Sequence, residues 1–531
     1  MPTVVTYNRH FATQRYISCE LIIFASYYIN GMRKIQILLI AVLYIMTAQT
    51  AAAQSRDFKL GQWTEIHNSI LKELSRSYVD TLPIDKMMRK GVDSMLEQLD
   101  PYTIYVPEEE NEDLQMMLSK TYGGIGAIIH KKKEDNVIIN EPYFGSPAHK
   151  NGLQCGDEIL AIDGIPTKGL ETKESSDRMK GKPGTTVVFT VKKVHTGDTL
   201  DIPIIRERIH FPDIEYAGML DDTTGYILQS GFTEGVSQQL KEKFIDLKGK
   251  GMKRLVLDLR GNGGGLMSEA INIISLFVPK GSLAVSSKGK TEGSTKEFHT
   301  QTEPIDTETP VIVMIDGGSA SASEIVSGGL QDLKRAVIMG KTSFGKGLVQ
   351  SIRPLPYNGQ MKVTTAKYYT PSGRCVQGIG VSPDVEIDVP SYSRLVYSLV
   401  LSGVMDQYIL KFAREHENIA AVDDFHFSDT DFEDFINFAK TQEFDYRSSA
   451  KATFDKMKKE LKEDGLEEMM AGELAALEKA LEMDKEKFIR LKKDEIIPFI
   501  EEEIATRYWF QEAGVKVRLR YDEQLKEALR K

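Results

Sequence analysis

The sequence of 531 residues predicts a multidomain α/β protein, with an α/β core, a β-rich module before that core and helical regions at both ends. Three observations predict this fold class. Strand and helix patterns alternate over residues 209–390, short β-type runs between glycine turns fill residues 119–208, and apolar residues elsewhere follow three- and four-residue spacing. Alternating strands and helices favour a core built on a parallel sheet.

Residues 1–53 have the pattern of an exported leader. Met32-Arg33-Lys34 precedes the short apolar run Ile35–Met46, and small residues at Ala51 and Ala53 complete a secretory signal peptide with cleavage expected after Ala53. We therefore expect translation to start at Met32 and the protein to be exported to the periplasm or the cell envelope. The alternative is an uncleaved leader that anchors the chain in the inner membrane.

The composition limits the partners and cofactors. The formal net charge is −10, and the basic leader leaves the remainder more acidic still, which argues against a nucleic acid partner. Beyond the leader the cysteines are Cys155 and Cys375, too far apart to suggest a disulfide framework. The nine histidines show no metal-ligand spacing, so no metal and no cofactor are predicted.

Two regions precede the core. Residues 54–118 form a helical region, because apolar residues recur at helical spacing from Trp63 to Leu99 and Asp100-Pro101 stops the pattern. Residues 119–208 form a compact β-rich module, with the runs "GIGAIIH", "NVIIN", "DEILAIDG", "TTVVFTVKK" and "TLDIPII".

The core, residues 209–390, alternates the strand runs "GYILQS", "RLVLDLRG", "PVIVMIDGG" and "AVIMG" with helices expected over Val236–Leu247, Leu266–Phe277 and Ser323–Leu333. Residues 391–531 are helical almost throughout. Apolar spacing from Leu466 to Leu491 favours an amphipathic helix packed on its own domain over a coiled-coil arm.

The stretch "GGSASASEIVSG", residues 317–328, places serines at a strand-to-helix turn. Ser321 is a candidate nucleophile, because backbone N–H groups at a helix N-terminus can stabilise an oxyanion. Helix capping is the commoner role of such a serine. The outer serines, Ser319 and Ser323, would hold the turn in shape and cap the helix. The alanines between the serines would leave room for the substrate backbone.

A candidate base lies in "GKTSFGKGLVQ", residues 340–350. Burial of Lys346 would lower its pKa and leave a neutral amine that can accept the serine proton. The same segment nearly matches a phosphate-binding P-loop, but Gly347 stands where that loop requires Ser or Thr.

The segment "LDLRGNGGG", residues 257–265, ends another core strand in a glycine-rich turn. This turn could supply a second N–H group for an oxyanion hole, and a pair between Asp258 and Arg260 could hold the turn in place. Its glycines could equally mark a strand end that needs positive φ.

The order of these motifs resembles the carboxyl-terminal processing proteases, or tail-specific proteases. The motifs are "DLRGNGGG", "GGSASASEI" and "GKTSFGKGLVQ", preceded by "YGGIG" and "GLQCGDEILAIDG" and by "LDPYTIYVPEEE". The resemblance covers about residues 60–390. It implies a crotonase/ClpP-like α/β serine-protease core with a PDZ domain, residues 119–208, inserted before it.

The resemblance also implies roles for individual residues. Ser321 would be the nucleophile, Lys346 the general base and Gln350 the group that orients the lysine. The backbone N–H of Ala322, with one from Gly264 or Gly265, would form the oxyanion hole. Glu324 matches the glutamate that follows the family's nucleophile, and charge pairing at the helix N-terminus is its simplest role.

In the PDZ-like module, the resemblance implies that a loop captures the free C-terminal carboxylate of a substrate whose tail adds as a strand. The loop residues are Tyr122, Gly123, Gly124, Ile125 and Gly126. Arg178 would link the module to the core, with a surface salt bridge as the alternative.

These observations predict an exported serine endopeptidase that recognises C-terminal tails and cuts with a Ser-Lys dyad. Its expected partners are protein or peptide substrates with free C-termini, and the C-terminal helices could support a homo-oligomer or bind an adaptor. A catalytically silent PDZ scaffold and, more weakly, a P-loop-like nucleotide-binding protein are the alternatives.

Overall fold

The computed structural model describes residues 57–130, 135–388, 392–482 and 484–531. The expected leader, with its start at Met32 and its signal peptide, lies outside the described residues. None of the described helices is both long and apolar enough to cross a membrane. The chain divides into two compact units, residues 1–94 and residues 95–531.

The first unit is helical where it is described. Residues 57–77 form one helix, and a second, α2 (Ile84–Glu97), begins in this unit. The helix α2 ends before Asp100-Pro101, as the sequence predicts. Large apolar side chains of the first helix, such as Phe58 and Trp63, are exposed within this unit.

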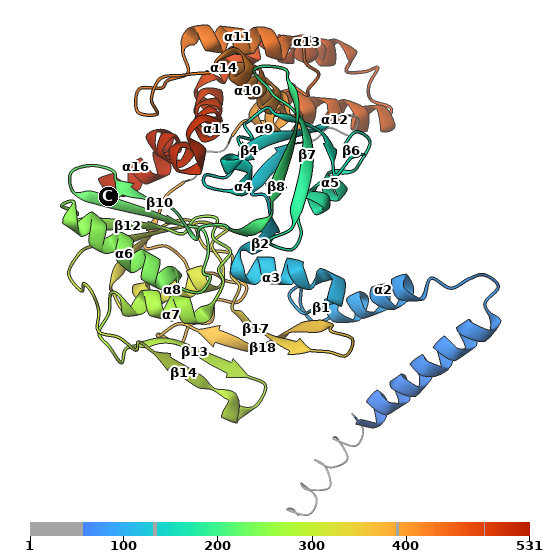
Figure 1. Ribbon diagram of the computed structural model, residues 1–531, viewed down its shortest axis with the longest axis vertical. Coiled ribbons are helices and arrows are strands. Elements are labelled where there is room, and N and C mark those ends of the chain that lie inside the picture. Colours follow the sequence, from blue (N-terminus) through green and yellow to red (C-terminus); the bar gives the residue numbers. More distant parts are fainter. Residues whose placement is uncertain (1–56, 131–134, 389–391, 483) are drawn as a thin grey trace, which may run out of the picture. The chain divides into compact units, whose positions relative to one another are not determined.

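The α/β core of the second unit (Figure 1) is built on a six-stranded sheet, whose strand order is β10-β11-β12-β15-β16-β19. All its neighbours pair in parallel except β10 with β11, which confirms the predicted α/β class. The strands are β10 (Ile214–Met219), β11 (Thr224–Gln229), β12 (Arg254–Asp258), β15 (Val311–Ile315), β16 (Ala336–Gly340) and β19 (Val385–Glu386), and the connecting helices are α6 (Val236–Gly249), α7 (Met267–Ser275) and α8 (Ala322–Asp332).

Different parts of the chain cover the two faces of this sheet. Alternate strand residues such as Ile227 and Leu255 pack with α6, α7 and α8. Their neighbours Tyr226 and Val256 pack instead against Leu525 and other side chains of α15 (Lys493–Tyr521) and α16 (Glu523–Arg530). The C-terminal helices therefore form a layer of the core, which the sequence analysis did not predict.

A second, antiparallel sheet beside the core was also not expected. Its order is β1-β18-β13-β14, and β17 pairs with β18 as well. It brings residues 104–106 next to the strand hairpin that follows Lys346. The strands are β1 (Ile104–Val106), β13 (Leu283–Gly289), β14 (Lys296–His299), β17 (Leu348–Pro354) and β18 (Gln360–Tyr369), with short 3-10 turns η1 (Glu108–Glu110) and η2 (Glu292–Ser294).

The β-rich module is compact, with buried side chains such as Ile139, Ile159 and Phe189 at its centre. Its main sheet has the order β3-β4-β5-β7-β8, so β3 is an edge strand. A separate pair, β2 and β9, joins the module to α3 and to the core. The elements are α3 (Asn111–Ser119), β2 (Thr121–Gly124), β3 (Ala127–His130), β4 (Val137–Pro142), α4 (Pro147–Lys150), β5 (Glu158–Ile162), β6 (Ile165–Pro166), α5 (Thr172–Met179), β7 (Thr186–Lys192), β8 (Thr199–Ile205) and β9 (Glu207–His210).

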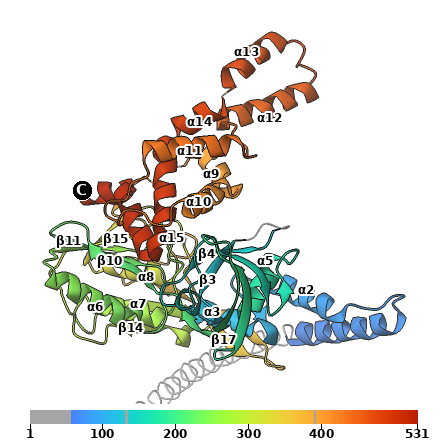
Figure 2. The same ribbon diagram turned by 45° about the horizontal axis from the view of Figure 1, so that its top comes forward.

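The C-terminal region is helical, but the single amphipathic helix expected over Leu466–Leu491 is wrong. The helix α12 ends before Gly465, which has φ 73°. Leu466 and Met470 lie outside any helix, and the apolar residues after them are divided between two further helices. Leu474 is buried, whereas Leu477 is 44% exposed. Helices α12 and α13 lie side by side (Figure 2), joined by Glu478, which bonds Lys451 and Lys458. The helices are α9 (Arg394–Leu401), α10 (Val404–Glu415), α11 (Asp429–Lys440), α12 (Ser449–Glu463), α13 (Ala471–Leu481) and α14 (Lys485–Leu491).

Candidate active site

Ser321 lies at the turn between β15 and α8, as the N-cap residue of that helix. Its φ of 58° and ψ of −112° are unusual for a residue with a side chain. The turn is held from both sides, because the Ser321 N–H donates to the Glu324 carboxylate at 2.8 Å and the Tyr368 hydroxyl donates to the Ser321 carbonyl at 3.1 Å. Strain held in this way is characteristic of functional turns.

The outer serines brace the turn, as expected. The Ser319 hydroxyl donates to the Leu259 carbonyl and the Ser323 hydroxyl to the Asn262 carbonyl, both at 2.8 Å, which ties the turn to the glycine-rich segment after β12. Ala320 and Ala322 are buried, and neither lines the cavity described below, so the role expected for the alanines stays a prediction.

Lys346 lies in the loop between β16 and β17, and it is half-buried. Burial lowers the pKa of its amine, and the nearby positive charge of Lys362 lowers it further, while Glu324 opposes the shift. The Lys346 Nζ atom lies 4.6 Å from the centroid of the Tyr102 ring. Among the described residues, no hydrogen bond joins this amine to the Ser321 hydroxyl.

Glu324 joins the serine turn to the lysine loop. Its side chain is fully buried, and one carboxylate oxygen accepts the N–H groups of Ser321 and Lys346, both at 2.8 Å. The other oxygen accepts the Gly345 N–H at 2.8 Å and the Ser343 hydroxyl at 2.5 Å. Glu324 therefore fixes both the serine turn and the lysine loop, which is more than the charge pairing expected from the sequence.

The same bonds argue against the P-loop alternative. A P-loop holds phosphate with its free backbone N–H groups, whereas those of Gly345 and Lys346 are already bonded to the carboxylate of Glu324. A strand, β17, follows the lysine where a P-loop would begin a helix.

Ser321, Lys346 and Gln350 line one cavity of about 350 Å³. Gln350 lies on β17 and donates to the Thr364 hydroxyl at 3.3 Å, so the structure brings it to the site without a bond to the lysine. The remaining lining residues are Lys120, Phe232, Thr233, Gly263, Gly264, Gly265, Leu266, Met267, Ile325, Leu348, Val349, Ile352, Lys362 and Tyr368.

The two candidate oxyanion glycines differ in their hydrogen bonding. The Gly264 N–H donates to the Asn262 side-chain oxygen at 2.9 Å, so it is already occupied. No protein acceptor for the N–H of Gly265 or of Ala322 is found among the described residues. Gly264 has a packing role instead, because at φ 95° a Cβ atom there would lie 2.6 Å from the Ala320 carbonyl oxygen.

The strand end before these glycines is anchored by charge. Arg260 Nε pairs with the buried Asp258 carboxylate at 3.0 Å, which the sequence analysis had suggested. The Arg260 guanidinium also bonds Asp522 at 3.2 Å and Gln524 at 2.8 Å, and both belong to the C-terminal helical region. No sequence signal indicated these distant partners.

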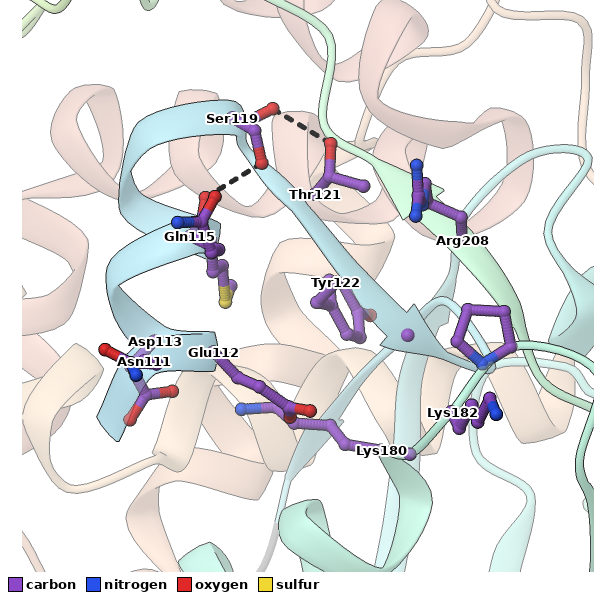
Figure 3. Close-up of a pocket in the computed structure, with 14 residues that line it drawn as sticks. Asn111, Glu112, Asp113, Gln115, Ser119, Thr121, Tyr122, Lys180, Lys182 and Arg208 are labelled. Carbon is purple, nitrogen blue, oxygen red and sulfur yellow. Dashed lines mark hydrogen bonds between the residues drawn. The ribbon is translucent and has the colours of Figure 1, made fainter. Parts of the chain in front are cut away.

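The predicted tail-binding loop is only partly a loop. Residues 122–124 belong to β2, paired with β9, and Ile125 is buried. Tyr122 and Gly123 line a separate cavity of about 660 Å³, whose wall includes α3 on one side and Lys180, Lys182 and Arg208 on the other (Figure 3).

Arg178 does not reach the core in this structure. It lies on α5, and its carbonyl accepts a bond from Arg206 at 2.7 Å. Its side chain makes no hydrogen bond or ion pair with any described residue.

The sequence analysis missed Tyr102 and Lys362 as site residues. Tyr102 lies within "LDPYT", where the Thr103 hydroxyl accepts the Thr364 N–H at 3.2 Å and so ties this segment to the strand beside Gln350. The resemblance of this motif to the family pattern was the only signal, and it gave no role.

Three models of known protein families match parts of this chain. The model of "Peptidase family S41" matches residues 223–387, "PDZ domain" matches residues 123–204, and "Probable PDZ-protease, C-terminal helical domain" matches residues 395–531.

The "Carboxy-terminal-processing protease" of Bartonella bacilliformis is 38% identical over 327 residues, which cover 60% of this chain and 74% of that protein. A "Probable CtpA-like serine protease" of Staphylococcus aureus is 33% identical over 331 residues, 62% of this chain and 65% of that protein, so slightly less than two thirds of its length is spanned. Among solved structures, the photosystem II D1 C-terminal processing protease is 29% identical with a TM-score of 0.37, covering 60% of this chain and 86% of that one.

Proposed function

Because the chain belongs to peptidase family S41, with the carboxy-terminal-processing proteases, we propose that it is an exported endopeptidase that cuts with a Ser321–Lys346 dyad and recognises C-terminal tails. The protein is a serine protease with a PDZ domain, and it acts on peptide or protein substrates. The observation that carries the proposal is the single cavity shared by Ser321, Lys346 and Gln350.

In the proposed reaction, the Ser321 hydroxyl attacks a peptide carbonyl while the neutral Lys346 amine takes its proton. The oxyanion that forms accepts the N–H groups of Ala322 and Gly265, which have no acceptor in the described protein. Lys346 then returns the proton to the departing amine. Water, with its proton taken by the same lysine, releases the acyl group from Ser321.

Alignment of the dyad requires movement of the lysine side chain. Its amine lies over the Tyr102 ring in this structure. Its flexible four-carbon chain allows the amine to leave the ring and approach Ser321. Gln350, which lines the same cavity, then orients the amine by hydrogen bonding.

Tail recognition is proposed for the PDZ domain. The edge strand β3 follows directly after Tyr122–Gly126, so a substrate tail can add to it as a further strand while backbone N–H groups of this segment hold the carboxylate. Arg178, on α5 of the same domain, is proposed to link tail binding to the core.

We also propose that the chain after the leader is divided into regions at residues 54–118, 119–208, 209–390 and 391–531. The leader is proposed to direct export, and the C-terminal helices are proposed to form a homo-oligomer or to bind an adaptor. Exposed apolar side chains of that region, such as Met469, favour such a contact.

Cleavage of an unstructured protein with an apolar C-terminal tail tests the proposal. Wild type should cut, Ser321→Ala and Lys346→Ala should not, and Lys341→Ala, in the same loop but paired outside the cavity with Glu386, should cut normally. An amidated tail should be cut more slowly if the PDZ domain binds the carboxylate. Cleavage by either dyad variant would refute the dyad, whereas binding without cleavage by wild type would favour the scaffold alternative.

A further inference from the structure

The catalytic cavity contains a lysine that the proposed reaction does not use. Three lysines line it, Lys120, Lys346 and Lys362, and none of the described residues lining it is Asp or Glu. A lysine of this lining that keeps its charge favours an anionic ligand.

The three lysines differ in their partners. Lys120 is neutralised, because its amine lies 3.1 Å from the buried carboxylate of Asp213 and bonds the Ser230 hydroxyl at 3.0 Å. Lys346 is proposed to be neutral when it acts as a base. Lys362 is half-buried and forms no ion pair or hydrogen bond with any described residue.

The strand register places Lys362 on the wall of the cavity. On β18 it is two residues from Thr364, which accepts the bond from Gln350, so both side chains share one face of the strand. Its partner across the β17–β18 pair is Ile352, which also lines the cavity.

We propose that Lys362 binds a carboxylate of the substrate close to the scissile bond, and thereby determines which peptide bonds are cut. This inference rests on the proposed function of the cavity. Burial of an ammonium group without a partner is unfavourable, and a substrate carboxylate would supply that partner. The carboxylate is either an Asp or Glu side chain or the C-terminal carboxylate of the tail.

Lys362 also affects the base. The groups that face Lys346 are Lys362 from β18, Glu324 from α8, Tyr102 from the segment before β1, and Lys120, which Asp213 neutralises. The positive charge of Lys362 disfavours a second ammonium group and so lowers the pKa of Lys346. Removal of that charge should raise this pKa and move the acid limb of the pH profile to higher pH.

The test uses peptides that carry one Glu, or Gln in its place, at successive positions around the scissile bond, each with a free or an amidated C-terminus. Wild type should prefer the carboxylate-bearing peptide by about 10- to 100-fold in kcat/KM at one position. Lys362→Met should lose this preference, and Lys362→Arg should keep it. Lys367→Met, an exposed lysine on the same strand, is the matched control and should behave as wild type.

The outcomes separate the two proposals. If the wild-type preference depends on Glu at one position, Lys362 binds a side-chain carboxylate of the substrate. If it depends on the free C-terminus, Lys362 binds the carboxylate of the substrate tail. If Lys362→Met keeps the wild-type preference in both series and its acid limb does not move, the role of Lys362 is refuted. Cleavage by Ser321→Ala would refute the proposed function instead, whatever the Lys362 variants do.

Discussion

Replacement of Glu324 by Gln tests whether one carboxylate holds the serine turn and the lysine loop together. The substitution keeps the shape of a fully buried side chain but replaces one acceptor oxygen by an NH₂ group. The amide nitrogen fits best beside Ser343, whose hydroxyl can turn to accept its hydrogen. The Gly345 N–H, now bonded at 2.8 Å, would then face another donor.

The magnitude follows from these bonds. The bond from Gly345 is lost, which is worth about 1.5–3 kcal/mol, the bond to Ser343 is reversed, and the bonds from Ser321 and Lys346 lose their charged acceptor. We therefore expect a destabilisation of about 2–4 kcal/mol. The two loops are then free to shift, and a displacement of about 1 Å at a catalytic group can lower the rate about 100-fold. Loss of the negative charge also removes the interaction that raises the pKa of Lys346, so the acid limb of the remaining activity should move to lower pH.

The assay is kcat/KM for an unstructured substrate across pH, with urea denaturation and circular dichroism on the same samples. Glu269→Gln is the matched control, because Glu269 is also buried and accepts the Ser237 N–H at 2.9 Å, but joins α7 to α6 without contacting either catalytic loop. The control should lose stability and keep its activity. A folded Glu324→Gln protein with wild-type kcat/KM would refute the reasoning.

Three further outcomes are expected. The kcat/KM of wild type should rise with pH as Lys346 loses its proton, at a pH below the ordinary lysine pKa. Lys346→Arg stays protonated and should abolish cleavage at every pH. If the Arg variant still cleaves with the same acid limb as wild type, this prediction is contradicted. Gly264→Ala should lower activity at least tenfold, because its Cβ would meet the Ala320 carbonyl and φ is positive, whereas Gly263→Ala, with open space around it, should be near wild type in the same assay. Asp522→Ala should cost about 1–3 kcal/mol in urea denaturation and lower kcat more than it raises KM, while the exposed neighbour Glu523→Ala should change neither.

Short motifs made the α/β core and the loops that carry Ser321 and Lys346 predictable from the sequence. The strand, turn and helix around Ser321 are contiguous, so the order of their local patterns predicted that the serine lies at a strand-to-helix turn. The lysine is likewise marked by the two glycines beside it. The parallel order of the core strands followed from their alternation with helices.

Contacts between distant segments were not predictable in the same way. Tyr102 meets Lys346, and Asp522 meets Arg260, only because the antiparallel second sheet and the C-terminal helices bring them together. Tyr102 lies in a motif that resembles the family pattern but gave no role, and Asp522 lies in no motif that the sequence analysis singled out. Which of Gly264 and Gly265 has a free N–H group likewise depends on the side chain of Asn262, which accepts the Gly264 N–H. The spacing of residues in the sequence does not reveal the direction of that side chain.

The covering of the core sheet by α15 and α16 has a consequence for the synthesis of the protein. Strands β11, β12, β15 and β16 leave the ribosome long before the helices that bury one of their faces. Until those helices are made, apolar side chains such as Tyr226 and Val256 stay open to water or to chaperones, and Arg260 lacks its distant partners. The sheet that carries Ser321 therefore reaches its final packing only after this C-terminal region has been made.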